Sequence, residues 1–145
     1  MKRIALLLVL AAAACRTVAV PDTSLTGGAD PRGAVDRFLA GARAGDIQAI
    51  GSVFGNDKGP LRNQSDRATV ERQLLIQLQC LRHDQATITG PTRGEGGRQV
   101  FMADMVQVKN AATVKFTTIR GPSDRWYVEI FDIITLQNKG FCSKS

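Results

Sequence analysis

Apolar residues in the first half of the chain recur with the period of a helix. After Asp30 and Pro31 they occupy the i, i+3, i+4 and i+7 positions of one helical face as far as Gly45. Asp30 suits an N-cap, Pro31 a first helical turn, and Gly45 the left-handed position after a helix. The chain therefore predicts a helix between Asp30 and Gly45. Its apolar stripe consists of Val35, Phe38, Leu39 and Ala42.

Two more helices are predicted before residue 83. Asp46 caps a short second helix, which ends in the glycine-containing segment 55–59. A third helix begins at Ser65 or Asp66 and extends to about Arg82, with Cys80 in its last turn. The apolar positions are Ile47, Ile50, Val53 and Phe54 in the second helix, and Val70, Leu74, Leu78 and Leu81 in the third.

From residue 84 the apolar period changes to two, which indicates strands. The first strand ends where Gly90 and Pro91 break it. Three further strands are predicted over residues 98–109, 113–120 and 125–135. Tight turns at residues 110–112 and 121–124 force antiparallel pairing. The last strand is apolar on both faces, so we expect it to be central or covered.

The predicted elements belong to one domain. Helices followed by an antiparallel meander indicate an α+β fold, with N-terminal helices packed on a curved four-stranded antiparallel sheet. Residues 32–145 have the size of one small domain, and they contain no internal repeat. Residues 15–31 are rich in Pro, Gly, Ser and Thr without a sustained apolar period, which predicts a flexible tether.

The beginning of the chain has the layout of a secretory signal peptide. Lys2 and Arg3 precede the apolar run 4–10, and alanines follow as far as Ala14. The apolar run is much shorter than the roughly 20 residues that a helix needs to cross a bilayer. We therefore expect residues 1–14 to be a signal peptide that is removed, rather than a permanent membrane span.

The sequence Ala12-Ala13-Ala14-Cys15 resembles the lipobox of bacterial lipoproteins. The resemblance implies cleavage before Cys15, diacylglycerol on its thiol and an acylated amine, which together anchor a protein stably to a membrane. Arg16 stands where an aspartate favours the inner membrane, so the expected location is the outer membrane of the bacterial cell envelope, facing the periplasm. The alternative is an ordinary secreted protein, with Cys15 free or left on the discarded peptide.

The remaining cysteines form an even pair. The chain has three cysteines, and lipidation of Cys15 leaves Cys80 and Cys142. In an oxidising compartment this pair predicts a disulfide. Two buried reduced thiols are the alternative.

Charge gives no sign of a nucleic-acid partner. The chain has 19 Lys and Arg against 13 Asp and Glu, a formal charge of +6 that falls to +4 without Lys2 and Arg3. Arg62, Arg67 and Arg72 are spaced so that they wrap around a helix, and the sequence has no basic cluster or arm. The excess of positive charge fits a solvated surface, or loose attraction to anionic lipid headgroups beside the anchor.

Three segments resemble a known superfamily. Residues 34–40 read Ala-Val-Asp-Arg-Phe-Leu-Ala, residues 44–50 read Ala-Gly-Asp-Ile-Gln-Ala-Ile, and residues 125–128 read Arg-Trp-Tyr-Val. They resemble the nuclear transport factor 2-like superfamily, which includes small bacterial lipoproteins of unknown function. The resemblance implies a cystatin-like cone of helices and strands around a pocket. Some members use the pocket for isomerase, dehydratase or cyclase chemistry, many use it only for binding, and the family often dimerises through its strands.

The family's enzymes place an Asp, His or Tyr inside the cone, which makes Asp104, Asp132 and Tyr127 the candidate catalytic residues here. Each aspartate stands in an apolar row of its strand. Burial would raise the pKa of either carboxyl and prepare a general base, with Tyr127 as hydrogen-bond donor, provided that the side chains point inward. The alternative is that a bulge or strand end turns each aspartate to solvent, or that it pairs with Arg120 or Lys115.

Other motifs for chemistry are weak. His83 is the only histidine, which excludes a multi-histidine metal site, and we expect it beside the carbonyls that end the third helix. Residues 94–97 lack the ending of a phosphate loop and predict a mobile hairpin loop. The chain has no Gly-x-Ser-x-Gly elbow for a catalytic serine. No metal or cofactor is predicted.

Three functional hypotheses follow. The leading one is a non-catalytic, lipid-anchored envelope protein whose cone binds a small apolar ligand or an envelope protein. The second is an isomerase- or hydrolyase-like enzyme with Asp104 or Asp132 as general base. The third is a structural module in which the cone is filled by its own side chains and the sheet forms a homodimer.

Overall fold

The computed structural model describes residues 26–143, which form a mixed α+β domain with a four-stranded antiparallel sheet. The predicted fold class is confirmed at this level. The helices are α1 (Pro31–Ala44), α2 (Ile47–Val53), α3 (Arg67–Leu81) and α4 (Ile133–Asn138). The strands are β1 (Gly55–Asn56), β2 (Gly59–Pro60), β3 (Gln85–Arg93), β4 (Gln99–Gln107), β5 (Asn110–Arg120) and β6 (Trp126–Phe131). The 3-10 helices are η1 (Leu61–Asn63), η2 (Glu95–Gly97) and η3 (Pro122–Asp124).

The predictions for the beginning of the chain lie outside the described residues. These are the signal peptide, the lipidation of Cys15 and the tether up to residue 25. Within residues 26–143, none of the helices is both long and apolar enough to cross a membrane.

Aspartate caps start the first three helices at the predicted positions. The Asp30 carboxylate accepts the Gly33 N–H at 2.7 Å, and Gly45 ends α1 with a φ of +71°. The Asp46 carboxylate accepts two N–H groups in the first turn of α2, each at 3.0 Å. Asp66 caps α3 in the same way. Because each such cap stabilises a helix by about 1 kcal/mol, these residues set the helix starts.

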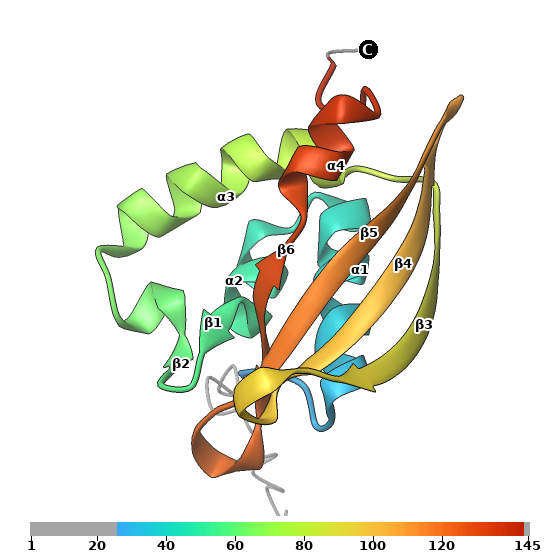
Figure 1. Cartoon of the computed structure of the whole chain (residues 1–145). Helices are drawn as coiled ribbons and strands as arrows, with labels where there is room; N and C mark the ends of the chain where they lie inside the picture. The colour runs from blue at the N-terminus through green and yellow to red at the C-terminus, as the bar shows by residue number, and fades with distance from the viewer. Residues whose placement is uncertain (1–25, 144–145) are drawn as a thin grey trace, which may run out of the picture.

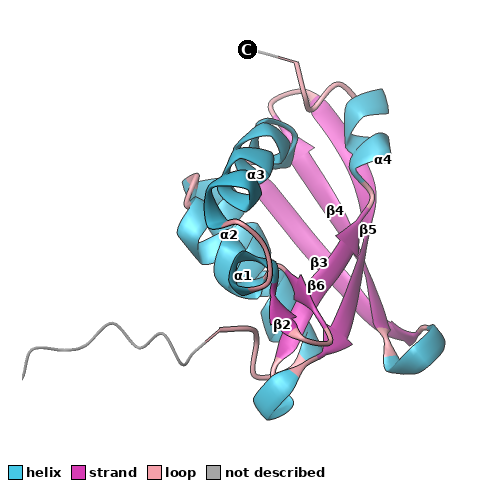
Figure 2. Ribbon diagram, turned by 90° about the vertical axis from the view of Figure 1, so that its left-hand side faces the viewer, coloured by secondary structure: helices cyan, strands magenta, loops and turns pink. Residues whose placement is uncertain are grey.

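The sheet has the strand order β3-β4-β5-β6. Helices α1, α2 and α3 lie together on one side of it (Figure 1, Figure 2). Strand β6 is an edge strand, with the β1–β2 hairpin in contact with it and Gly28 paired with Trp126. The prediction that this strand is central or covered on both faces is wrong, because Ile130 on its outer face is 58% exposed. Helix α4 lies beside the part of β5 that extends past β6, since β6 pairs with β5 only from Phe116 to Arg120.

Aromatic rings form the centre of the core between the helices and the sheet. Phe38 of α1 is fully buried. Its ring centroid lies 5.4 Å from that of Phe131, 5.8 Å from that of Phe116 and 6.0 Å from that of Phe54. Such ring pairs add to the stability that burial of their apolar area already provides. This cluster joins α1 to β5, to β6 and to the end of α2.

Strand β3 continues through Gly90 and Pro91, where the sequence predicts a break. Thr89 and Thr92 both keep partners in β4, so Gly90 and Pro91 together stand opposite one residue, which is a β-bulge. Gly90 tolerates its φ of +120°, and Pro91 needs no second partner because β3 is an edge strand. The predicted strand end at this point is wrong.

The strand predicted over residues 125–135 ends at Phe131, and α4 follows it. The Asp132 carboxylate accepts the Thr135 N–H at 3.1 Å and the Thr135 hydroxyl at 2.7 Å, so it caps a helix. A short apolar run fits a strand or a buried helix equally well, and here the cap makes Ile133 and Ile134 helical.

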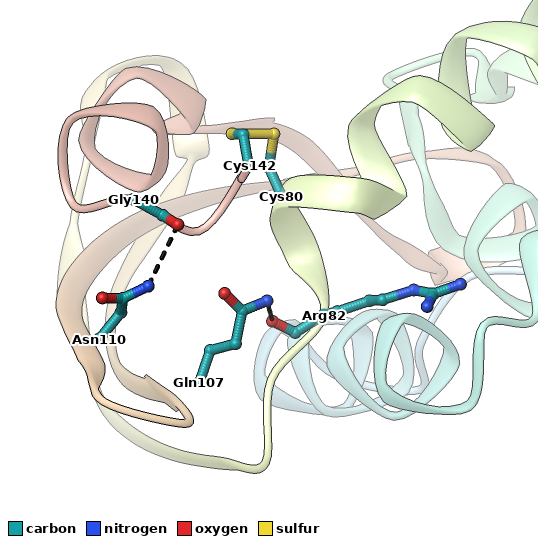
Figure 3. Close-up of a disulfide and its surroundings, with 6 residues drawn as sticks. All are labelled: Cys80, Arg82, Gln107, Asn110, Gly140 and Cys142. Atoms are coloured by element: carbon teal, nitrogen blue, oxygen red, sulfur yellow. Dashed lines mark hydrogen bonds between the residues drawn. A yellow bond between two sulfur atoms is a disulfide. The ribbon is translucent and has the colours of Figure 1, made fainter. Parts of the chain in front are cut away.

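Cys80 and Cys142 form a disulfide, which confirms the predicted pair (Figure 3). The bond joins the last turn of α3 to the segment after α4, across a sequence separation of 62 residues. Phe141, next to the bond, is fully buried in the core. The end of the described chain is therefore held against the domain.

Candidate functional site

Neither of the two candidate aspartates is buried in the core. Asp104 is exposed on the outer face of the sheet, where its carboxylate accepts the Thr113 hydroxyl at 2.6 Å. The side chains of β4 that are buried against the helices are Phe101, Ala103 and Met105. Asp132 caps α4, and the hydrogen bond from the Thr135 hydroxyl lowers the pKa of this carboxyl instead of raising it. The structure agrees with the alternative in which neither aspartate is a buried base.

Tyr127 is buried, but it holds the start of the domain in place. Its hydroxyl lies 3.0 Å from the Thr26 hydroxyl, and the two groups form a hydrogen bond. Its ring lies so close to Gly27 and Gly121 that a Cβ at either glycine would come within 3.0 Å of ring carbons. Tyr127, Asp104 and Asp132 are thus not assembled into one site.

A cleft of about 710 Å³ opens at the end of the domain where α1 and α3 end. We call it the terminal cleft. It is lined by Arg43, Ala44 and Gly45 at the end of α1, by Arg82, His83 and Asp84 between α3 and β3, by Gln107, Val108, Lys109 and Asn110 at the β4–β5 turn, and by Gly140 and Ser143 near the disulfide. Its volume is in the range of sites for small molecules.

Side-chain amides tie the walls of the terminal cleft together (Figure 3). The Gln107 amide donates a hydrogen bond to the Arg82 carbonyl at 2.8 Å. The Asn110 amide donates to the Gly140 carbonyl at 3.1 Å. Together with the disulfide, these bonds connect the α3–β3 segment and the C-terminal segment to the β4–β5 hairpin.

The turn between β4 and β5 consists of Val108 and Lys109, not of residues 110–112 as predicted. Val108 has a φ of +51°, which a β-branched residue rarely adopts. Its N–H donates to the Asp84 carboxylate at 2.7 Å, which helps to hold the turn in this conformation. Asp84, the one carboxylate among the described residues of the lining, therefore already accepts a hydrogen bond.

His83 is the most deeply buried polar residue of the lining, with 5% of its surface exposed. Its Nδ1 donates to the Leu81 carbonyl at 2.8 Å, as expected for a histidine after a helix C-terminus. Its Nε2 is buried and has no hydrogen-bond partner among the described residues. Burial, and after it the nearby Arg43, lowers the pKa of His83 below 6.5, so the imidazole is neutral at pH 7.

The buried imidazole predicts a loss of stability in mild acid. The unfolded chain binds the proton below pH 6.5, whereas the folded protein resists protonation until its lower pKa is reached. The free energy of unfolding is therefore unaffected by His83 above pH 6.5, and falls as the pH decreases, by at most about 1.4 kcal/mol at pH 5.5. Urea unfolding at pH 7.5 and 5.5, in the wild type and in His83→Gln, measures this contribution. Parallel pH dependence of the two proteins would contradict it.

The arrangement is suited to binding. A nucleophile or an acid–base pair with His83 would need a serine, a cysteine or a carboxylic acid nearby. The described lining offers only Asp84, whose carboxylate already accepts the Val108 N–H, and Ser143. No group of three or more His, Cys, Asp or Glu side chains within residues 26–143 is placed to hold a metal ion. The described lining offers cations, amides and the His83 imidazole, all of which are groups that can bind a ligand.

Among the residues that line the terminal cleft, the sequence analysis considered only His83 for a chemical role. Arg43, Arg82 and Lys109 each stand at the end of an element, where a cation is ordinary because helix ends and turns are solvated. No spacing in the chain connects these positions. Only the packing of α1, α3 and the β4–β5 hairpin brings them to one opening.

Comparisons with known proteins do not place the chain in a family. No protein-family model matches it, and neither the curated proteins nor the solved structures give a significant match. The geometry of the terminal cleft therefore carries the functional argument.

Proposed function

We propose that the protein is a non-catalytic binding protein of the bacterial envelope, anchored through Cys15, and that its ligand occupies the terminal cleft. The single observation that supports this function is a cleft of about 710 Å³ whose walls come from four separate segments, three of which are connected by a disulfide and side-chain hydrogen bonds. A site that is fixed before binding loses less conformational entropy when the ligand arrives.

The position of the cleft fits this function. The described chain begins at Thr26, where the Arg125 guanidinium donates to the carbonyls of Thr26 and Gly27 at 3.0 and 2.8 Å. Helix α1 leads from this end of the domain to the terminal cleft at the other (Figure 1). The 11 positions from Cys15 to Thr26 reach at most ~40 Å, so a lipid on Cys15 would keep the domain near the membrane with the cleft directed away from it.

We further propose that the fold is a nuclear transport factor 2-like cone. The order of three helices before an antiparallel meander supports it, as does the placement of α1 across the sheet. The terminal cleft would be the mouth of that cone, while the aromatic cluster fills its interior. The polar lining favours a polar ligand over the small apolar ligand of the leading hypothesis from the sequence.

A dimerisation module is the second candidate. Its support is the outer face of the sheet, where Met102 and Ile130 are 39% and 58% exposed although they are apolar. A protein that sediments as a monomer at high concentration would remove this candidate.

A substitution that fills the terminal cleft tests the proposed function. Ser143 is exposed in the lining, so Ser143→Trp is expected to block the cleft without disturbing the core. Ser65→Trp is the matched control, because Ser65 is exposed ahead of α3 and lies outside the lining. The 15N-labelled protein would be titrated with small molecules of negative, neutral and positive charge. Binding that Ser143→Trp abolishes and Ser65→Trp preserves supports the function, and binding that is equal in both variants contradicts it.

A further inference from the structure

The terminal cleft is lined by cations that have no partner among the described residues. Arg43, Arg82 and Lys109 line it, and the side chain of none of them forms an ion pair or a hydrogen bond with the described residues. Four other arginines of residues 26–143 are ion-paired, and they are Arg32, Arg67, Arg98 and Arg120. Within residues 26–143, carboxylates thus pair with arginines elsewhere, but none forms an ion pair with these three.

The helix ends at the cleft reduce this positive charge without cancelling it. The C-termini of α1 and α3 each contribute about half a negative elementary charge, and this effect fades within one turn. Asp84 contributes one more negative charge, although its carboxylate already accepts the Val108 N–H. Against three cationic side chains, the described part of the lining therefore retains an excess of about one positive charge. Two carbonyls at the end of α3 also already accept hydrogen bonds: the Leu81 carbonyl from the His83 imidazole, and the Arg82 carbonyl from the Gln107 amide.

The amides of the lining leave acceptors for a ligand. The amide nitrogens of Gln107 and Asn110 donate to the Arg82 and Gly140 carbonyls. Their side-chain oxygens form no hydrogen bond with the described residues. These oxygens accept hydrogen bonds from hydroxyl groups, whereas the guanidinium groups of Arg43 and Arg82 match the two oxygens of a carboxylate or phosphate.

We propose that the ligand of the terminal cleft is a small hydroxylated molecule with a carboxylate or phosphate group, which Arg43, Arg82 and Lys109 bind. This inference rests on the proposed function and adds the chemical class of the ligand. Arg43, Arg82 and Lys109 line the same partly open cleft, and cations in the walls of a cleft raise the local concentration of anions. A soluble ligand is favoured over a lipid headgroup, because the cleft lies at the end of the domain opposite Thr26.

The single histidine makes the experiment direct. Citrate and inorganic phosphate would be titrated into the protein, and the imidazole signals of His83 followed by NMR without ambiguity of assignment. We expect saturable shifts with citrate, weaker ones with phosphate, and a rise in the pKa of His83 when either anion is bound, because a nearby anion favours the imidazolium. Glycerol and spermidine, one neutral and one cationic, are expected to leave the signals unchanged.

Two arginine variants with the same change in net charge separate the site from general attraction. Arg43→Gln is expected to weaken citrate binding about tenfold or more, the usual effect of losing a charge-assisted hydrogen bond. Arg93→Gln is the control, because Arg93 is exposed at the far end of β3 and forms no ion pair within residues 26–143. Equal loss in both variants would overturn the inference.

The remaining outcomes distinguish failure of the inference from failure of the proposed function. A neutral or cationic ligand that Ser143→Trp blocks, with no response to citrate or phosphate, overturns the anionic class and leaves the binding function intact. Binding to phosphatidylglycerol vesicles that Arg43→Gln abolishes, without binding of the soluble anions, also overturns the inference. If Ser143→Trp blocks no ligand of any charge, both proposals fail.

Discussion

Removal of the disulfide by Cys80→Ala and Cys142→Ser is expected to lower the free energy of unfolding by about 4 kcal/mol. The bond closes a loop with a sequence separation of 62 residues, and without it the unfolded chain regains the conformations that the loop excludes. Thermal unfolding would report a decrease in Tm of roughly 10–20 °C for a domain of this size. Ligand binding should weaken as well, because Gly140 and Ser143 lose the bond that holds them at the terminal cleft.

Reduction supplies the control for this prediction. A thiol reductant should destabilise the wild type to the level of the double variant and leave the double variant unchanged. A variant that unfolds at the same urea concentration as the oxidised wild type would show that packing of Phe141 and Leu136 holds the C-terminal segment without the bond.

Truncation of Phe38 to alanine is expected to cost about 3–5 kcal/mol of stability. Phe38 is fully buried and lies against the rings of Phe54, Phe116 and Phe131, so its loss leaves a cavity where α1 meets the sheet. Urea denaturation gives the free energy directly.

Ile76→Ala is the comparison for this truncation. Ile76 is 63% exposed on α3, so its removal takes away little buried area and should cost less than ~0.5 kcal/mol. A Phe38→Ala variant that is no less stable than Ile76→Ala would mean that the aromatic cluster is not the centre of the core.

These two changes act at different distances from the proposed site. The disulfide borders the terminal cleft, whereas the aromatic cluster lies in the core between α1 and the sheet. Loss of the disulfide should therefore reduce both stability and citrate binding. Phe38→Ala should reduce stability while the fraction that stays folded keeps its affinity, as long as α1 remains in place.

Local chemistry determined where the helices begin and end. Asp30, Asp46 and Asp66 satisfy N–H groups that helix starts leave unpaired, and Gly45 adopts a positive φ without steric cost. These interactions span only a few residues, so they are legible in the sequence. The disulfide was predictable for a different reason: once Cys15 is assigned to lipidation, only Cys80 and Cys142 remain to pair.

The face of β4 was decided by tertiary structure. One row of this strand contains Met102, Asp104 and Val106, the other contains Phe101 and Met105, and both are largely apolar. The period of two assigns the side chains of β4 to two faces, but it does not determine which face packs against the helices. Packing of the helices on the sheet buried the row with Phe101, which placed Asp104 on the outer face and outside the interior where a buried base was expected.

The sequence by itself determined where α1, α2 and α3 begin, because caps and apolar periods depend on neighbours a few residues away. It did not determine that Ile133 and Ile134 belong to helix α4, because the apolar run was equally compatible with a strand and with a helix. It did not reveal the terminal cleft either, since Arg43, Arg82 and Lys109 are tens of residues apart in the chain. Only the folded domain, by ending α1, α3 and β4 at the same edge, brought these charges together.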